Sequence, residues 1–514
     1  MKTQKQRIVR RKEQDNPPIA AATPPRESGP SASRYFYAAA LVALAFAAAA
    51  VLSFHWMYEP DLGWHLAQGR EIAAGNLLKT NFFSWTYPNY RQLYLSWLFE
   101  LSTFWVWKGG GAAGIQIAQA VVIGITLILV YLACRRRAPV SAALAVTILG
   151  VFLIEPRAVP RPHVLSFLFG AACALLVERA RETRSLTPLV WTIPVIAVWS
   201  NFHAESLFGS ALVGIFAFCE LIRPGSLSRE QAWKAMGIAA AATVANMANP
   251  YGPGLFLYLL EGSRAPEIVQ IAELRPAYLP TYAPFFAYLA AGVVLMIWKR
   301  RSLALWEMLA FAAFAYLALR HVRFVTLFMC VTAPIVAARL ANLNERLART
   351  PVLPLIALGL GLVLTPVPLS ARFEMFGTGP AYIEPPTLAE SGAAAFIRNA
   401  HLSGPVFNSV SLGGYLIWNT YPDVRVFQDG RFQSYPPEHF ARIVSSFASQ
   451  PEWDKLVAGV DWAVLNVQRN TPLTGYGRFT PDAWVPVYQD RSIMIVVRRK
   501  GKYGTLAATA SSQR

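Results

Sequence analysis

The amino-acid sequence predicts an α-helical multi-pass membrane protein that carries a small α/β soluble domain near its C-terminus. Three observations lead to this fold class. The 514 residues are 54% hydrophobic and only 15% charged, whereas soluble domains carry about a quarter charged residues. The apolar residues come in blocks of about 17 to 25 residues, the length that crosses a bilayer. Residues 370–500 break this pattern and alternate short apolar runs with helical stretches of soluble length.

The N-terminal part of the sequence predicts a tail and an anchor. Residues 1–34 are polar, basic and rich in Pro and Ser, which is typical of a disordered tail, here on the cytoplasmic side. Residues 35–54 are apolar over the length of one crossing. We expect a retained anchor rather than a cleaved signal, because the segment follows so long a basic tail.

Residues 55–110 are expected to form the first outer loop. Within it, residues 61–74 and 93–107 have helical patterns, and the second stretch is rich in Trp. If residues 93–107 crossed the membrane, the next apolar block would deliver the arginines at 135–137 to the outside, which the positive-inside rule disfavours. The sequence therefore predicts two interfacial helices on the outer surface, with the glycines at 109–111 as a hinge before the next crossing.

The chain then alternates between inner loops rich in Lys and Arg and outer loops that hold the other polar residues. About eleven crossings follow from this alternation and from the block lengths, so that the transmembrane domain spans residues 35–369. The N-terminus is then inside and the C-terminal part outside. The blocks after the anchor are residues 112–134, 138–154, 164–177, 189–200, 207–222, 235–247, 284–298, 303–319, 324–338 and 352–367.

The distribution of charge and the spacing of the cysteines argue against a nucleic-acid-binding protein and against a protein held by disulfides or zinc. A net charge of +18 would suggest a nucleic-acid partner, but the basic residues cluster in short inner loops, where they fix the topology. We therefore expect membrane lipids, and no nucleic acid, as partners. The four cysteines form no Cys-x-x-Cys pair, so neither a disulfide framework nor a structural zinc site is indicated.

Residues 370–500 predict a small extracytoplasmic α/β domain with a parallel sheet. Its last two apolar runs are joined by a short polar turn and predict a hairpin. Residues 501–514 are expected to be a disordered tail. The expected strands are residues 406–408, 424–427, 462–465, 485–488 and 492–497, and the expected helices are residues 388–399 and 438–449.

Two carboxylates and two imidazoles stand where the chain leaves the first crossing. They are His55, Glu59, Asp61 and His65, with aromatic residues between them. Carboxylates at a lipid boundary are costly unless something pairs or uses them. We therefore consider Glu59, Asp61 and His65 candidate catalytic residues. Asp61 is also suited to cap the helix that follows, since Asp is favoured at that position.

Further polar side chains fall on the outer ends of the expected crossings. Five of the seven histidines lie there. Polar groups from several connections that converge on one face indicate a shared cavity, although headgroup contact, helix capping and local ion pairs account for such residues as well. The candidate substrate-binding residues are Arg157, Arg161, His163, Asn201, His203, Glu205, Asn249, Arg320, His321 and Arg323.

These residue types suit the transfer of a sugar from a phosphate. Arginine binds phosphate oxygens through paired hydrogen bonds, and a carboxylate takes the proton of an attacking hydroxyl. Glu, Asp and His together also suit a divalent cation such as Mg²⁺ or Mn²⁺. Because the outer face has no nucleotide supply, the donor is expected to be a lipid-linked phosphosugar in the same bilayer.

Short motifs along the chain resemble those of one enzyme family. Residues 59–61, Glu-Pro-Asp, match the acidic motif in the first outer loop of the C-type (GT-C) integral-membrane glycosyltransferases, which include protein O-mannosyltransferases and lipid A aminoarabinose transferases. The resemblance implies that Asp61 is the catalytic carboxylate and that the donor is a polyprenyl-phosphate sugar. Leu62 stands where many relatives carry a second acid, which weakens the case for a metal. Uncharacterised bacterial proteins of this class resemble the chain over residues 61–69, 201–203 and 413–431.

The sequence thus predicts a glycosyltransferase at the outer face of a bacterial inner (plasma) membrane. It is expected to move a sugar from a polyprenyl-phosphate carrier to a hydroxyl of a glycan, lipid or protein acceptor. Asp61 is the expected general base, and Arg161, Arg320 and Arg323 are expected to receive the phosphate. Two alternatives stay open: a non-enzymatic polysaccharide-assembly or carrier-lipid transport protein, and an oligosaccharide ligase. A transporter is expected to hold polar residues deep within its helices, whereas these apolar blocks are nearly free of charge.

Overall fold

The computed structural model describes residues 32–53, 59–77, 79–92, 95–257, 272–298, 300–343, 345–365, 392–468 and 470–512. The chain divides into two units, Met1–Leu44 and Ala45–Arg514. The described part of the first unit is the beginning of helix α2 (Ala32–Ser53), and the second unit contains the other described elements. The expected N-terminal tail lies outside the described residues except for its last three positions, which belong to α2. His55 also lies outside them.

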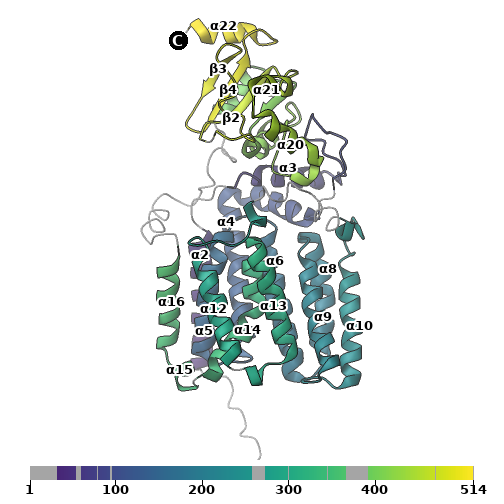
Figure 1. Ribbon diagram of the computed structural model, residues 1–514, viewed down its shortest axis with the longest axis vertical. Helices are drawn as coiled ribbons and strands as arrows, with labels where there is room; N and C mark the ends of the chain where they lie inside the picture. The colour runs from purple at the N-terminus through teal and green to yellow at the C-terminus, as the bar shows by residue number, and fades with distance from the viewer. Residues whose placement is uncertain are drawn as a thin grey trace, which may run out of the picture. The chain divides into compact units, whose positions relative to one another are not determined.

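The first part of the second unit is a bundle of apolar helices (Figure 1). Among the described residues, four stretches are long and apolar enough to cross a membrane, namely Trp97–Arg135, Val140–Arg157, His163–Thr183 and Val322–Asn342, and five apolar helices are shorter. The chain is thus a multi-pass membrane protein, while the number of about eleven crossings stays a prediction. The helices are α4 (Trp97–Arg135), α5 (Val140–Ile154), α6 (His163–Thr183), α7 (Thr187–Val190), α8 (Thr192–Phe202), α9 (Ser206–Ile222), α10 (Arg229–Ala245), α12 (Ala283–Trp298), α13 (Leu305–Arg320), α14 (Val325–Leu343), α15 (Glu345–Arg349) and α16 (Val352–Leu364).

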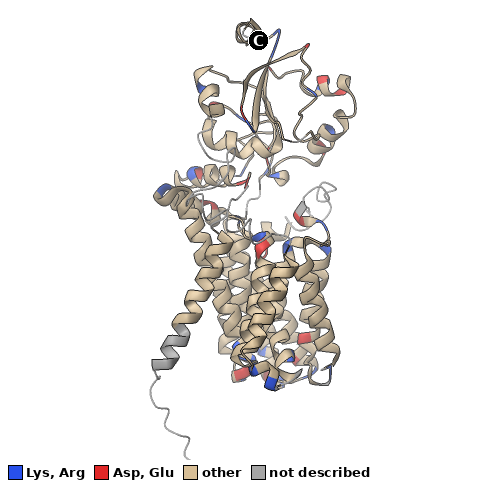
Figure 2. Ribbon diagram, turned by 90° about the vertical axis from the view of Figure 1, so that its left-hand side faces the viewer, with Lys and Arg blue, Asp and Glu red and all other residues tan. Residues whose placement is uncertain are grey.

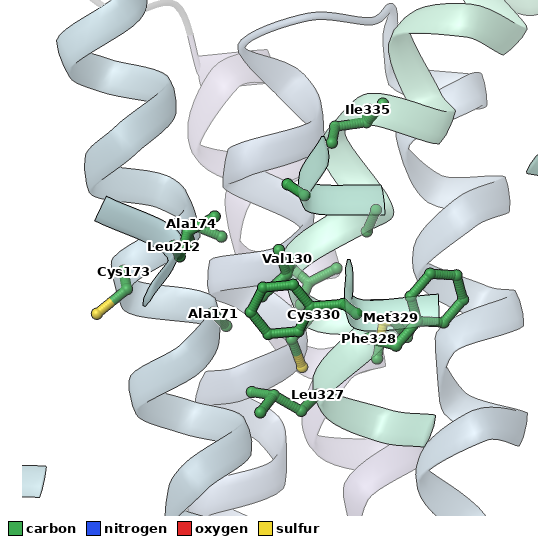
Figure 3. Packing of buried hydrophobic residues seen from close by; sticks show 14 of the residues in the cluster. Val130, Ala171, Cys173, Ala174, Leu212, Leu327, Phe328, Met329, Cys330 and Ile335 are labelled. Atoms are coloured by element: carbon green, nitrogen blue, oxygen red, sulfur yellow. The ribbon is translucent and has the colours of Figure 1, made fainter. Parts of the chain in front are cut away.

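Helix α14 lies at the centre of the bundle, because it is apolar on every face. It contacts α4, α5, α6, α12 and α13. Phe328 packs edge-on against Phe285, Tyr288 and Phe311, with ring centroids 5.9, 5.7 and 5.2 Å away, and Figure 3 shows this region around Phe328 and Cys330. Charged residues gather at the two ends of the bundle (Figure 2). The apolar middle of the bundle therefore leaves its ends as the places for polar chemistry.

Helix α4 is broken once, at Gly111, whose backbone angles (φ 56°, ψ −145°) are not helical. Glycine tolerates a positive φ because it has no Cβ. The break separates an aromatic first part, beginning at Trp97, from the long apolar part that ends at Arg135. Trp105 in the first part is 52% exposed, which suits a helix lying at a membrane surface. The expected hinge is therefore present, and the second expected surface helix begins at Trp97.

The C-terminal domain contains a four-stranded sheet of β1 (Val406–Asn408), β2 (Trp462–Asn466), β3 (Trp484–Gln489) and β4 (Ile493–Arg498), in the order β1-β2-β4-β3. The first pair, β1 and β2, is parallel, whereas β4 runs antiparallel to both β2 and β3. The sheet is therefore mixed rather than parallel as expected, and the expected hairpin is present as β3 and β4. The helices are α18 (Gly392–Asn399), α19 (Gly413–Thr420), α20 (Pro437–Ser446), α21 (Gln450–Leu456) and α22 (Gly504–Ser512).

The expected strand at residues 424–427 is not part of the sheet. Val426 makes an isolated bridge to Ser84 of the first loop. The backbone N–H of Phe427 donates to the side chain of Asn408 instead of to a neighbouring strand. The apolar run is buried as expected, but its backbone bonds to the first loop and to the Asn408 side chain and not to the backbone of a sheet strand.

The expected disordered tail after residue 500 is also wrong. Helix α22 packs on the C-terminal domain through Ala507, which is buried in its core. Tyr503 anchors the helix, because its hydroxyl accepts from the backbone N–H of Ser403 and donates to the C=O of the same residue. Tyr503 and Ala507 alone form too short an apolar pattern to predict this helix from sequence.

The first loop and the C-terminal domain share one hydrophobic core. Trp64 and Phe83 are buried together with Tyr415 and Leu416. Helix α3 (Leu62–Ala73) contacts α19, and the Asn81 side chain donates to the backbone C=O of residue 434 over 2.8 Å. The conformation of the loop that carries Glu59 and Asp61 is therefore fixed in part by residues more than 300 positions later in the sequence.

A fully buried polar network joins the two segments. Arg431 donates to both carboxylate oxygens of Asp429, over 2.9 and 2.7 Å. It also donates to Asn81 Oδ1 over 2.8 Å and to Gln92 Oε1 over 3.2 Å. The hydroxyl of Tyr435 donates to Asp429 over 2.8 Å. One guanidinium thus links the first loop to the C-terminal domain.

Replacing Arg431 by methionine is expected to destabilise the protein by about 3–5 kcal/mol, because the buried Asp429 charge loses its counter-ion. The measurement is the thermal unfolding midpoint of the detergent-purified protein. Arg425→Met is the matched control, since Arg425 is an exposed arginine of the same domain. Equal midpoints for the two variants would contradict the structural role of Arg431.

His439 makes the stability of the C-terminal domain depend on pH. It is buried among aromatic rings, stacked on Tyr435 at 4.9 Å, and its Nε2 is buried without a hydrogen-bond partner among the residues that the structure describes. Burial lowers the pKa of His439 from 6.5 to about 4. As the pH falls, the unfolded chain therefore takes up this proton at a higher pH than the folded protein does. The stability that depends on a neutral His439 is complete above pH 6.5 and is lost as the pH falls toward 4.

Lowering the pH from 7.5 to 5 is expected to remove about 2 kcal/mol of stability through His439. The His439→Phe variant keeps an aromatic ring of similar size but cannot bind the proton. Unfolding midpoints of both proteins at the two pH values check this. Relative to the wild type, the unfolding midpoint of the variant should be higher at pH 5 than at pH 7.5. An equal difference in midpoint at the two pH values would show that His439 does not titrate as described.

Candidate active site

The candidate catalytic loop lies directly before helix α3. Asp61 occupies the N-cap position of α3, but its side chain makes no capping hydrogen bond. Instead, Oδ1 accepts a hydrogen bond from Trp64 Nε1 over 3.0 Å, and Oδ2 lies 2.8 Å from Arg161 Nη2. The side chain is 17% exposed. The capping role considered from the sequence is therefore not what orients this carboxylate.

Arg161 gathers three carboxylates around its guanidinium. Its Nε donates to Glu59 Oε2 over 2.7 Å and its Nη2 to Glu59 Oε1 over 2.9 Å. Its Nη1 pairs with Glu273, and its Nη2 also contacts Asp61. Burial alone would lower the pKa of Arg161, but the three carboxylates raise it well above its usual range. Burial raises the pKa of Glu59, and Arg161 partly offsets this. The guanidinium is thus a permanent positive charge at the centre of an acid cluster, which we define as Glu59, Asp61 and Glu273.

Arg157 and His163 support this cluster from one side. Arg157 Nη1 lies 3.0 Å from Glu273 Oε1, and its Nη2 donates to His163 Nδ1 over 3.0 Å. His163 Nε2 in turn donates to the backbone C=O of Arg157 over 2.9 Å. Burial alone would raise the pKa of Glu273, but Arg157 and Arg161 lower it well below its usual range. Two arginines therefore hold the carboxylate of Glu273 in its charged form.

A second group forms where α8 meets α9 and where α13 meets α14. Arg323 Nε donates to Glu205 Oε1 over 3.1 Å, and Arg323 Nη2 lies 3.4 Å from His203 Nε2. His203 Nδ1 lies 3.2 Å from Glu205 Oε2 and 2.9 Å from the Ser166 hydroxyl. Burial would raise the pKa of Glu205, but His203 and Arg323 lower it far below its usual range. Arg323 and His203 are thus two hydrogen-bond donors held by one buried carboxylate.

His65, one turn into α3, pairs with a carboxylate of α4. Its Nδ1 is 2.7 Å from Glu100 Oε1, and both side chains are buried. Burial lowers the pKa of His65 well below 6.5, and the charge of Arg161 acts in the same direction, as do Arg431 and His203. The imidazole is thus neutral, and Glu100 fixes its orientation.

The C-terminal domain reaches the catalytic loop through glycines. A β-carbon built on Gly430 would lie 2.1 Å from Oδ1 of Asp61. A β-carbon on Gly414 would lie 2.4 Å from the backbone O of Pro60, and one on Gly63 would lie 2.3 Å from the backbone O of Gly414. Such distances leave no room for any side chain. The Gly-Gly and Asp-Gly-Arg stretches of the sequence therefore serve a close backbone approach to Asp61.

Four of the candidate residues belong neither to the acid cluster nor to the group around Arg323. Arg320 is exposed, and none of its described contacts joins the site. Asn249 accepts from the backbone N–H of Tyr251 in a turn. Asn201 accepts from Trp97 Nε1 over 2.8 Å and so ties α8 to α4. His321 Nδ1 donates to the backbone C=O of residue 274 over 2.6 Å, which holds the segment that carries Glu273.

Sequence reasoning missed Glu273, Glu100 and Gly430. Glu273 stands in the short 3-10 helix η3 (Ala272–Leu274), between the expected crossings at residues 235–247 and 284–298. Glu100 lies in the aromatic first part of α4, where a lone carboxylate among apolar residues was a usable signal. Gly430 belongs to a stretch whose resemblance to other proteins was noticed, but its spacing from Asp61 carries no information about contact.

A divalent cation does not fit the acid cluster as it stands. Its three carboxylates would suit Mg²⁺ or Mn²⁺ by type, but Arg161 lies between them and contacts each one. Among the described residues, no group of three or more His, Cys, Asp or Glu side chains is arranged to hold a metal ion.

A cavity of about 510 Å³ lies at the opposite end of the bundle and contains none of the candidate residues. It opens where α5 begins, whereas the acid cluster lies beyond the end of α5. It is lined by Arg137, Ala138, Pro139, Ala341, Asn342 and Arg349.

The helical bundle, the surface helices and the C-terminal domain together have the fold of GT-C glycosyltransferases. The solved structures that are similar to the chain include three of the archaeal oligosaccharyltransferase AglB of Archaeoglobus fulgidus. One, with an inhibitory peptide and a dolichol-phosphate, has a TM-score of 0.60 at 11% identity and covers 85% of this chain and 70% of that one. The apo form has a TM-score of 0.55 at 12% identity, with the same coverage. A complex with Zn and sulfate has a TM-score of 0.51 at 13% identity and covers 83% and 68%. No family model and no curated protein matches the sequence.

Proposed function

We propose that this protein is a membrane glycosyltransferase that moves a sugar from a polyprenyl-phosphate carrier to a hydroxyl acceptor. One observation carries the proposal. Asp61 is held by Arg161 and Trp64 at the end of a GT-C-type bundle. The same end carries a group of cationic donors, Arg323 and His203, which contacts Ser166 near the start of α6. The dolichol-phosphate in a neighbouring structure supports a lipid-linked phosphate as the carrier.

Asp61 is the proposed general base. Each of its oxygens has one described partner, Trp64 or Arg161, and a carboxylate offers about four acceptor positions. One position is therefore available to take the proton of the acceptor hydroxyl. The hydroxyl oxygen then bonds to the anomeric carbon, and the bond from that carbon to the carrier phosphate breaks with its electron pair on the phosphate. A single displacement of this kind inverts the anomeric configuration.

Positive charge is proposed to stabilise the leaving phosphate. Arg161 was expected to bind it, but four of its contacts go to the acid cluster. Arg323 is proposed instead. It is as exposed as Arg161, at 23%, its guanidinium lies beside His203, and its described ion pair is with one carboxylate, Glu205, rather than three. Arg320 is replaced in this role, because it is exposed and none of its described contacts is with the cluster.

The proposed orientation puts the acid cluster on the outer face of a bacterial inner membrane. The basic residues at the start of α5 and the end of α15 occupy the other end of the bundle, and such clusters stay on the cytoplasmic side. The outer face supplies no nucleotide sugar, which favours a lipid-linked donor.

Transfer of a preassembled oligosaccharide is the second candidate. The structural neighbours are named as oligosaccharyltransferases, and one holds a peptide. This candidate shares the base and the phosphate site and differs in the size of the transferred glycan. A transport protein without chemistry would need polar groups deep in the bundle, whereas the polar clusters described above lie at its ends.

The proposal is tested by incubating the purified protein with a panel of polyprenyl-phosphate sugars and, in parallel, lipid-linked oligosaccharides, together with glycan, lipid and peptide acceptors. Mass spectrometry follows release of the free carrier. Release from a monosaccharide donor supports the first candidate, and release from the oligosaccharide donor alone supports the second. Binding of the donors without release from any of them would contradict both.

A further inference from the structure

We infer that Arg161 takes the place of a divalent cation in the acid cluster, so that the protein works without a bound metal. This inference rests on the proposed function only for its consequence in transfer. The starting observation is a disagreement: a neighbour of the same fold was solved with Zn, whereas the carboxylates of this chain are already bound by a side chain.

Arg161 contacts every carboxylate of the cluster. The guanidinium makes four nitrogen–oxygen contacts to Glu59, Asp61 and Glu273. Glu59 uses both of its oxygens, and its side chain is only 2% exposed. Arg157 adds a further contact to Glu273 at 3.0 Å. The cluster thus opposes three negative charges with two fixed positive ones, and the paired, planar geometry is the one in which arginine binds carboxylates best.

A metal would have to displace this arrangement. Divalent cations such as Mg²⁺ hold carboxylate oxygens at about 2.0–2.1 Å and Ca²⁺ at about 2.3–2.6 Å. The oxygens that face one another across the cluster already face Arg161 at 2.7 to 2.9 Å. A cation among them would therefore stand directly against the guanidinium, and the two positive charges would repel each other.

The arrangement has a consequence for transfer. Arg157 and Arg161 offset two of the three negative charges. Glu59 is buried, whereas the side chains of Asp61 and Glu273 stay 17% and 20% exposed. The positive charge that a metal would bring is then built into the chain. We therefore expect transfer to be unaffected by a chelator.

The decisive experiment measures metal binding rather than activity. Purified full-length protein, stripped with EDTA and dialysed, is titrated with MnCl₂ and followed by calorimetry and by the Mn²⁺ spin-resonance signal. The variant Arg161→Met should bind Mn²⁺ at least about tenfold more tightly than the wild type, because repulsion by a guanidinium within about 4 Å is removed. The double variant Arg161→Met/Glu59→Gln should lose this gain. Arg320→Met is the matched control, since Arg320 is an exposed arginine at the end of α13.

The outcomes separate cleanly. Stoichiometric Mn²⁺ binding by the wild type that disappears in Glu59→Gln would overturn the inference, and this measurement holds even where Arg161→Met does not fold. Equal Mn²⁺ affinity in the wild type and a folded Arg161→Met would overturn it as well. If carrier release is observed, its loss in EDTA and return with Mn²⁺ would contradict the inference while leaving the proposed function intact. If no carrier release is observed, the metal titration still decides the question.

Discussion

Replacing Asp61 by asparagine is expected to reduce glycosyl transfer by about 10²- to 10⁴-fold, the usual contribution of a positioned base. The amide keeps the size of the side chain and an oxygen that can accept from Trp64 Nε1. Glu59 and Glu273 still pair with Arg161, so the surrounding structure is expected to persist. The initial rate of carrier release from the polyprenyl-phosphate donor, at equal amounts of purified protein, is the measurement.

The control for this prediction is Asp423→Asn, which changes an exposed aspartate of the C-terminal domain. It should transfer at the wild-type rate. The unfolding midpoint and membrane insertion of Asp61→Asn should match those of the control. Wild-type transfer by a correctly folded Asp61→Asn would remove Asp61 from the role of base.

Replacing Gly430 by alanine is also expected to reduce glycosyl transfer strongly, although Gly430 belongs to the C-terminal domain. The new methyl group would lie 2.1 Å from Asp61 Oδ1, so either the carboxylate or the Asp-Gly-Arg segment must move. A displacement of about 1 Å in a catalytic group costs on the order of 10² in rate. The overpacking should also destabilise the protein by about 1–3 kcal/mol. Carrier release and the unfolding midpoint measure the two effects.

Gly459→Ala is the matched control, because a β-carbon there meets no atom within 4 Å. It should leave both rate and midpoint unchanged. A Gly430→Ala variant with normal transfer would mean that the C-terminal domain does not bear on Asp61 in the working protein. Lost transfer with an unchanged midpoint would assign the effect to the position of the carboxylate alone.

The sequence was sufficient for the parts of the fold that local pattern determines. Apolar block length placed the helices α5, α9, α12 and α16 within a few residues, because burial in a membrane or in a bundle core imposes an unbroken apolar stretch. Gly111 was recognised as a break, since consecutive glycines weaken a helix. The strands β1 and β2 were found because they are short, fully buried and rich in apolar residues.

The candidate site was predictable as a set of residue types but not as a set of contacts. Asp61, Arg161, His163, His203 and Arg323 were singled out because ionisable groups at helix ends need partners. Their pairing depends on how connections far apart in sequence meet, and local spacing does not encode this. For that reason Arg161 was expected to bind a phosphate, whereas its side chain lies among carboxylates.

Docking of the C-terminal domain was the least predictable feature. The contact of Gly430 with Asp61 joins residues 369 positions apart by number, and the buried pair of Arg431 and Asn81 spans 350. A glycine in a sequence indicates only conformational freedom or the close approach of another segment. The sequence does not indicate which segment that is.

The most direct test is to locate the carrier itself. A polyprenyl-phosphate analogue with a photoreactive group beside the phosphate is cross-linked to the purified protein, and the labelled peptides are identified by mass spectrometry. The account predicts labels around the acid cluster and Arg323, within residues 59–74, 155–166, 203–208 and 321–326, and competition by unlabelled carrier. Labels confined to the cavity at the other end of the bundle, around Arg137 and Asn342, would contradict it.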